Sequence, residues 1–195
     1  TTAQIPNLTT DQVAALTSDQ IKVIETADIQ RLTTAQVASL TNTQVPALTS
    51  AQTLALQSDQ IAAMGAVNIT KLTGDRMTLL SASQVAALTT VQIQGLTNAE
   101  ITKMSTAQVQ ELTTAQMPAF TQSQIALFSS AQIAAMETQD VASLTTAQIS
   151  WLTAQQMPHF NSAQISALTT AQVAAIEVGD LTKRVSTEYE KLVRA

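Results

Sequence analysis

The residues of this chain whose types could support chemistry are few and lie far apart. His159 is the only histidine and Trp151 the only tryptophan, and the chain has no cysteine. His159 therefore has no second histidine or thiol with which to hold a metal ion, and no serine is placed by spacing for activation as a nucleophile. We expect no catalytic residue, no metal ligand and no cofactor, and we predict that the chain is not an enzyme. Trp151 and His159 remain a candidate outward contact for a partner.

A second set of polar residues recurs along the chain at a nearly constant interval, and its members are Asp28, Asn68, Glu100, Asp140 and Asp180. If they stacked in a column they could bind Ca²⁺, but the dense oxygen cage and glycine turn of calcium loops are missing. We favour the interpretation that they form solvated corners. A basic residue three positions later, such as Arg31 after Asp28, would then pair with the acid on one helix surface.

These residues all belong to an eight-residue unit that repeats without a gap, as TxxQ(I/V)xxL, in 24 octads from Thr1 to Leu192. Position eight is Leu, Ile, Met or Phe in 23 octads, and position five is Ile, Val, Met or Leu in 22. Position one is Thr, Ser or Asn in 18 octads and position four is Gln in 17. A Thr followed three residues later by Gln is typical of a capping box. The pattern predicts that every octad begins a short helix.

The spacing within the octad excludes one long helix. Positions five and eight lie on one face of a helix, but eight residues at about 100° each rotate that face by roughly 80° per octad. The four prolines, Pro6, Pro46, Pro118 and Pro158, all occupy position six, where they would break a continuous helix. In these octads we expect the helix to shorten to a single turn, because the residue before a proline is restricted.

A single octad cannot fold alone. Ordering eight residues costs about 12 kcal/mol, whereas burial of two aliphatic side chains returns roughly 3–6 kcal/mol. The octads must therefore stack, and we predict an all-α solenoid of short capped helices in residues 1–180, followed by a polar cap or linker helix in residues 181–195.

The recurring polar residues show a longer period, because they lie five octads apart, except that Asn68 and Glu100 lie only four octads apart. Two explanations of this five-octad spacing stay open. One is duplication of a block of five octads, with one octad lost between Asn68 and Glu100. The other is a superhelix with five octads per turn, in which the acidic residues form a column.

Composition narrows the range of partners. Only 12% of residues are charged, the net charge is −5 and the pI is about 4.7, so the basic stripe that phosphate contacts require is missing and we expect no nucleic acid partner. No apolar stretch is long enough to span a membrane. The chain begins in phase with the repeat and without Met, from which we expect it to be a fragment of a longer protein.

The uninterrupted array resembles the LTTxQ(I/V)xxL tracts of large bacterial secreted or surface proteins of the adhesin-like or haem-utilisation-like kind. This resemblance covers nearly the whole chain and implies a stalk or spacer at the cell exterior. We therefore predict a non-enzymatic structural or binding scaffold, with proteins or glycans as partners and with self-association through the solenoid ends as a further option. The alternative is a ligand- or protein-recognition module that uses an outward patch of Trp151 and His159.

Overall fold

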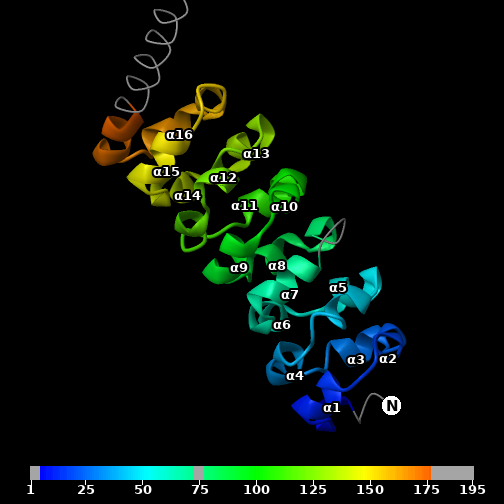
Figure 1. Cartoon of the computed structure of the whole chain (residues 1–195). Coiled ribbons are helices and arrows are strands. Elements are labelled where there is room, and N and C mark those ends of the chain that lie inside the picture. The colour runs from blue at the N-terminus through cyan, green and yellow to red at the C-terminus, as the bar shows by residue number, and fades with distance from the viewer. Residues whose placement is uncertain (1–4, 73–76, 177–195) are drawn as a thin grey trace, which may run out of the picture.

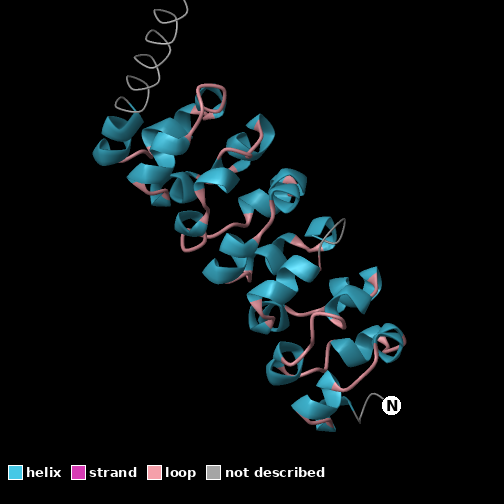
Figure 2. Ribbon diagram, in the orientation of Figure 1, coloured by secondary structure: helices cyan, strands magenta, loops and turns pink. Residues whose placement is uncertain are grey.

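The computed structural model is an elongated stack of short helices (Figure 1). It describes residues 5–72 and 77–176 of the 195. Throughout these two ranges the regular elements are helices, and neither range contains a strand (Figure 2). The all-α solenoid predicted from the octads is confirmed. The predicted terminal segment 181–195 lies outside the described residues.

The helices follow the octads one by one, and residues 170–176 are also helical. In chain order the elements are η1 (Ile5–Asn7), α1 (Thr10–Ala14), α2 (Ser18–Lys22), α3 (Thr26–Ile29), α4 (Thr34–Ala38), η2 (Val45–Ala47), α5 (Ser50–Ala55), α6 (Ser58–Ala63), α7 (Ala66–Lys71), η3 (Met77–Leu79), α8 (Ala82–Ala86), α9 (Thr90–Gly95), α10 (Asn98–Lys103), α11 (Thr106–Gln110), η4 (Met117–Ala119), α12 (Gln122–Ile125), α13 (Ser130–Ala135), α14 (Thr138–Ser143), α15 (Thr146–Trp151), η5 (Met157–His159) and α16 (Ser162–Ser166).

Several helices, among them α5, α9, α13 and α15, end where the residue at position eight leaves helical geometry. After α9, for example, Leu96 at position eight has φ −60° and ψ 134°, which directs the chain away from the helix axis into the next cap. The octads that contain proline form only a three-residue 3₁₀ helix, as in η4 around Pro118. The single turn expected in these octads is confirmed, since a proline at position six removes the hydrogen bond that an α-helix would need there.

Positions five and eight form one continuous core, as predicted, except that Ile165 and Val173 at position five are 43% exposed. Val37, Ile61 and Ile133 at position five are fully buried, and position-eight side chains such as Leu96 are nearly so. Thr53 interrupts the apolar pattern at position five, yet it is also fully buried. Its hydroxyl donates to the Thr49 carbonyl at 3.1 Å, which satisfies the polar group inside the core.

Helices three octads apart pack most closely along the solenoid. Examples are α4 on α6, α7 on α9, and α11 on both α8 and α13. A turn therefore requires fewer octads than the five-octad spacing suggested, and the alternative of five octads per turn is wrong. A column of acidic residues separated by five octads is wrong for the same reason, because residues five octads apart do not lie above one another. Asp180, its last expected member, lies outside the described residues.

Candidate functional site

The Gln at position four begins the helix of its own octad. Gln124 shows the arrangement: its Oε1 accepts the N–H of Thr121 at 2.8 Å, and its own N–H donates to Thr121 Oγ1 at 3.4 Å. These two bonds form the capping box predicted from the sequence. They also fix the side-chain amide, so that its nitrogen points away from the octad toward the preceding turn.

That nitrogen connects successive turns of the solenoid. Gln124 Nε2 donates to the carbonyl of Leu96 at 2.8 Å and to that of Ile93 at 2.9 Å, which lie 28 and 31 residues earlier. Fifteen position-four side chains donate at 2.5–3.0 Å to the carbonyl 28 residues earlier, and we call these bonds the position-four ladder: Gln36, Gln44, Gln52, Gln60, Asn68, Gln84, Gln92, Gln108, Gln116, Gln124, Gln132, Gln148, Gln156, Gln164 and Gln172.

The ladder provides hydrogen-bond donors for carbonyls that short helices leave unpaired. The last four carbonyls of a helix have no hydrogen-bond partner within that helix. In a helix as short as that of one octad, these unpaired carbonyls are a large share of all the carbonyls. Each rung supplies a donor to the carbonyl at position eight of the octad four places earlier, and most rungs, such as that of Gln124, also supply one to the carbonyl at position five. The Gln side chains themselves are at most 5% exposed. Since helices pack three octads apart and rungs span four, one turn takes between three and four octads.

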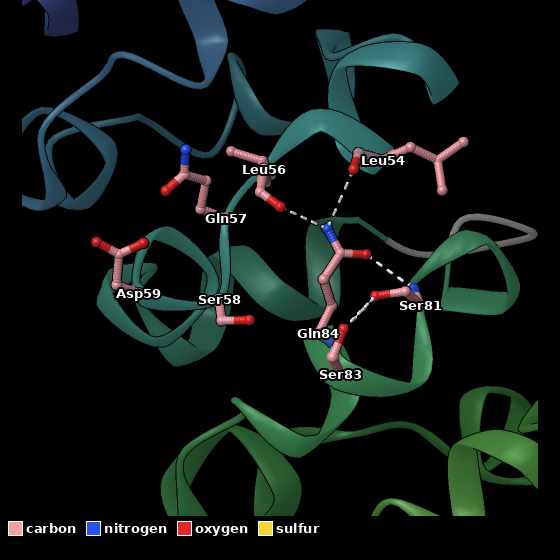
Figure 3. A pocket seen from close by; sticks show the side chains of 8 residues that line it. All are labelled: Leu54, Leu56, Gln57, Ser58, Asp59, Ser81, Ser83 and Gln84. Carbon is pink, nitrogen blue, oxygen red and sulfur yellow. Dashed lines mark hydrogen bonds between the residues drawn. The ribbon is translucent and has the colours of Figure 1, made fainter.

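Gln84 illustrates a rung beside an open groove (Figure 3). Its Nε2 donates to Leu56 O at 2.7 Å and more weakly to Leu54 O at 3.5 Å, while its Oε1 accepts the N–H of Ser81. The groove has a volume of about 540 Å³ and is also lined by Asp59. It is open to solvent and is shaped by the rung rather than by a cluster of reactive side chains.

The recurring polar residues occupy ladder positions, which corrects the expectation that they form solvated corners. Asp28 and Asn68 are only 7% and 8% exposed, and Glu100 and Asp140 only 1%. The physical reason is that position four faces the preceding turn in the described octads from Asp28 to Gln172. The ion pair between Lys22 and Asp19, at 3.1 Å, lies on a different octad.

The residues that replace Gln at position four differ in whether they can donate a hydrogen bond. Asn68 keeps an amide, and its Nδ2 donates to Leu40 O at 2.7 Å. Glu100 keeps the cap, because its Oε2 accepts the N–H of Thr97 at 2.6 Å, but its buried Oε1 has no hydrogen-bond partner. Both carboxylate oxygens of Asp140 are buried without a partner. An acid at position four therefore cannot complete the rung while it is ionised.

The fold changes the titration of Asp140. Burial, and to a smaller extent the nearby carboxylate of Glu137, raises the pKa of Asp140 from 3.8 to about 6. Glu137 stands at the cap position of α14 in place of the usual Thr, and it makes no side-chain cap bond. Its Oε2 instead accepts from Gln139 Nε2 at 2.8 Å.

The two residues expected to form an outward patch lie on consecutive elements. Trp151 ends α15 and is partly buried against the core, whereas His159 is exposed in η5. The structure records neither a hydrogen bond nor a ring contact between them. Their role as a partner contact stays a prediction.

Metal binding finds no support in the acidic side chains. Within residues 5–72 and 77–176, no group of three or more His, Asp or Glu side chains is arranged to hold a metal ion. Two further grooves, of about 310 and 400 Å³, are lined by Glu137, with Glu111 in the first and Asn161 in the second. Each is bordered mainly by polar and small side chains of several octads.

The capping role of Gln was predictable, but its second role was missed. One signal for it exists in the sequence. A capping box accepts Glu as well as Gln, yet position four is Gln in 17 octads and Glu only at Glu100 and Glu188. The preference for the amide indicates that a donor is needed, which capping alone does not explain.

Short capped helices that are joined turn to turn by buried Gln amides define an octapeptide-repeat α-solenoid. The model of the ALTTAQ repeat matches residues 1–23, 21–58 and 133–181, which together make up more than half of the chain, and the chain belongs to this repeat family. Neither a curated protein nor a solved structure matches it. Among the described helices, none has the length and apolar character needed to cross a membrane.

Proposed function

We propose that the chain is a non-enzymatic structural scaffold that acts as a stalk or spacer within a longer bacterial secreted or cell-surface protein. The observation that carries this proposal is the position-four ladder, which repeats the same cross-turn bond along the solenoid. The bacterial and exterior setting rests on the resemblance of the octads to tracts of adhesin-like and haem-utilisation-like proteins.

The ladder suits a spacer because it transmits stability from turn to turn. A hydrogen bond of this kind contributes about 0.5–1.5 kcal/mol net, and each complete rung adds one or two such bonds to the contact between packed core side chains. In a solenoid of this type every repeat contacts only near neighbours, so the length can grow by adding octads without closing the structure. The number of octads would then set the distance between whatever lies at the two ends.

Small-angle X-ray scattering of the purified chain, combined with circular dichroism, tests the scaffold. We expect the profile of an elongated particle and a helical spectrum, both unchanged over a wide range of protein concentrations. A compact particle, or a spectrum dominated by strand, would contradict the proposal.

A recognition module is the second candidate, favoured by the partial exposure of Trp151 and the exposure of His159 on the next element. Trp151 fluorescence should then change when glycans or peptides that bind the chain are added. His159→Ala retains the fluorophore, so it serves as the test variant, and Glu111→Gln, on a different octad, serves as the control. A response that is the same in His159→Ala and in the unmodified chain would exclude the two-residue patch.

A further inference from the structure

Asp140 stands at position four of its octad, as Asn68 does in another octad. Asn68 therefore shows what a side chain of this length does at that position. Asn and Asp have the same size, and Asn68 Nδ2 reaches the carbonyl of Leu40, 28 residues earlier, at 2.7 Å. The equivalent carbonyl for Asp140, at position eight of the octad four places earlier, is that of Leu112. A side chain of this length can therefore span the rung, but Asp140 presents an oxygen where Asn68 presents an N–H donor.

No hydrogen bond stabilises the carboxylate of Asp140 in its ionised form. The side chain is 1% exposed and neither oxygen has a hydrogen-bond partner. The carbonyl of Leu112 likewise receives no donor from any of the described residues. By analogy with Asn68 and Leu40, the register of the ladder assigns these two acceptors to the same rung, with no hydrogen to join them.

The charged groups around this rung all have the same sign as the carboxylate. α14 packs against η4 and α16, and neither of these elements carries a titratable side chain. The adjoining α13 and α15 carry none either. Glu137 on α14 itself and Glu111, next to Leu112, are both acidic and line one groove.

We propose that Asp140 is a proton-dependent rung of the ladder: in its protonated form the carboxyl O–H donates to the carbonyl of Leu112 and joins the two turns, and in its ionised form this bond is lost. The proton comes from water and returns to it, so the step needs no other reactant. Acid would therefore strengthen the contact between residues 109–112 and α14, whereas the neighbouring Gln rungs do not titrate. This inference does not depend on the role of the chain as a stalk.

The direction of the pH effect follows from the titration of Asp140. Its pKa is raised from 3.8 to about 6 in the folded chain, so the folded state binds more protons than the unfolded state between about pH 4 and pH 6. The contribution of this rung to stability is complete below about pH 4. It is lost as the pH rises through about 6.

The variant Asp140→Asn tests the proposal, because it supplies a permanent donor of the same size. We would measure the urea midpoint of unfolding of the unmodified chain and of Asp140→Asn from pH 4 to pH 8, and take the difference at each pH so that other titrating groups cancel. We expect equal midpoints near pH 4 and a higher midpoint for Asp140→Asn above pH 7. A difference that is constant with pH, or a lower midpoint for the variant at pH 7, would overturn the proposal.

Two further measurements guard against a variant that merely misfolds. In the unmodified chain, the ¹³C chemical shift of the Asp140 carboxyl group should titrate with a midpoint near pH 6, and a midpoint near the ordinary value for Asp would refute the proposal. The reciprocal variant Asn68→Asp should make a second rung pH-dependent and lower the midpoint mainly above pH 6. An equal loss for Asn68→Asp at pH 4 and pH 8 would also count against it.

Discussion

At the scale of the residue, one side-chain amide uses all of its hydrogen-bonding groups. The oxygen of Gln124 caps its own helix, and its nitrogen bonds two carbonyls of the preceding turn. Replacing this amide with a carboxylate keeps the cap and removes the donor, as Glu100 shows. The chemistry of the repeat therefore depends on the difference between an amide and an acid at one position.

Removing one complete rung should be costly. Gln124→Ala loses the cap bond and both cross-turn bonds and leaves the carbonyls of Ile93 and Leu96 without a side-chain donor, so we expect a loss of about 2–4 kcal/mol in the free energy of unfolding. Gln12→Ala is the matched control, because Gln12 is exposed and caps Thr9 but donates to no carbonyl of another octad in the described residues. Urea denaturation should show a loss of about 1 kcal/mol or less for this control. Equal losses in the two variants would mean that the cross-turn bonds contribute nothing.

Restoring an incomplete rung should stabilise the chain. Glu100→Gln keeps the bond to Thr97 N–H and places an amide nitrogen where the unpartnered Oε1 lies. In the register of the ladder, the carbonyl that this nitrogen would reach is that of Leu72, 28 residues earlier. We expect a gain of about 1–2 kcal/mol at neutral pH, because a buried acceptor is replaced by a donor. The measurement is again the urea midpoint, with Glu111→Gln on the surface as the control. A midpoint for Glu100→Gln that is unchanged or lower contradicts the role given to the ladder.

At the scale of the element, each helix is too short to be stable by itself. An isolated helix of five or six residues is far below the length that is marginal in water. The octads form helices because a cap fixes the first turn, while the core and the ladder fix the last. The Pro-containing octads show how little helix is required, since three residues of 3₁₀ geometry suffice in η2 and η4.

Much of the structure of the individual helices could be predicted from the sequence of one octad. The capping boxes, the core at positions five and eight and the shortened turns at Pro46 and Pro118 depend on residues at most four apart, and the structure confirms them. The burial of Asp140 could not be predicted in the same way, because the atoms that surround it come from other turns. A single repeat unit does not identify a partner that lies four octads away.

The cap residues themselves give the element-scale prediction. Thr145 Oγ1 accepts the N–H of Gln148 at 3.1 Å, so Thr145→Ala should lower the free energy of unfolding by about 1 kcal/mol. Thr145→Ser should have little effect, because Ser81, Ser105 and Ser129 form the same capping box in other octads. Thermal unfolding followed by circular dichroism compares the two variants. If they melted together, the hydroxyl cap would have no role in starting α15.

At the scale of the whole molecule, the solenoid resembles an α-helix built of octads, because each octad contacts those three and four places away. This geometry removes the superhelical explanation of the five-octad spacing and leaves duplication of a five-octad block. It also makes the octad, rather than the block, the unit by which the array can change length. The shorter interval of four octads between Asn68 and Glu100 is consistent with the loss of a single octad.

Deletions should show that the octad is the unit by which the array can change length. Removing residues 121–128 keeps every remaining position-four amide in register with the position-eight carbonyl four octads earlier, so we expect a folded helical rod with a slightly lower melting temperature. Removing only residues 121–124 shifts the amides beyond the cut by half an octad, so the rungs across it cannot form. Circular dichroism should show a much larger loss of stability for the shorter deletion. Better tolerance of the shorter deletion would contradict the octad register.

The most direct test of the central claim is a nuclear Overhauser measurement between turns of the solenoid. With selectively labelled Gln, the side-chain amide protons of Gln124 should show contacts to Ile93 and Leu96, 31 and 28 residues earlier, and those of Gln132 should show contacts to Ile101 and Met104. Contacts at these separations establish the position-four ladder and a turn of three to four octads. Contacts to residues five octads earlier, or amide protons that show contacts only within their own octad, would contradict the account.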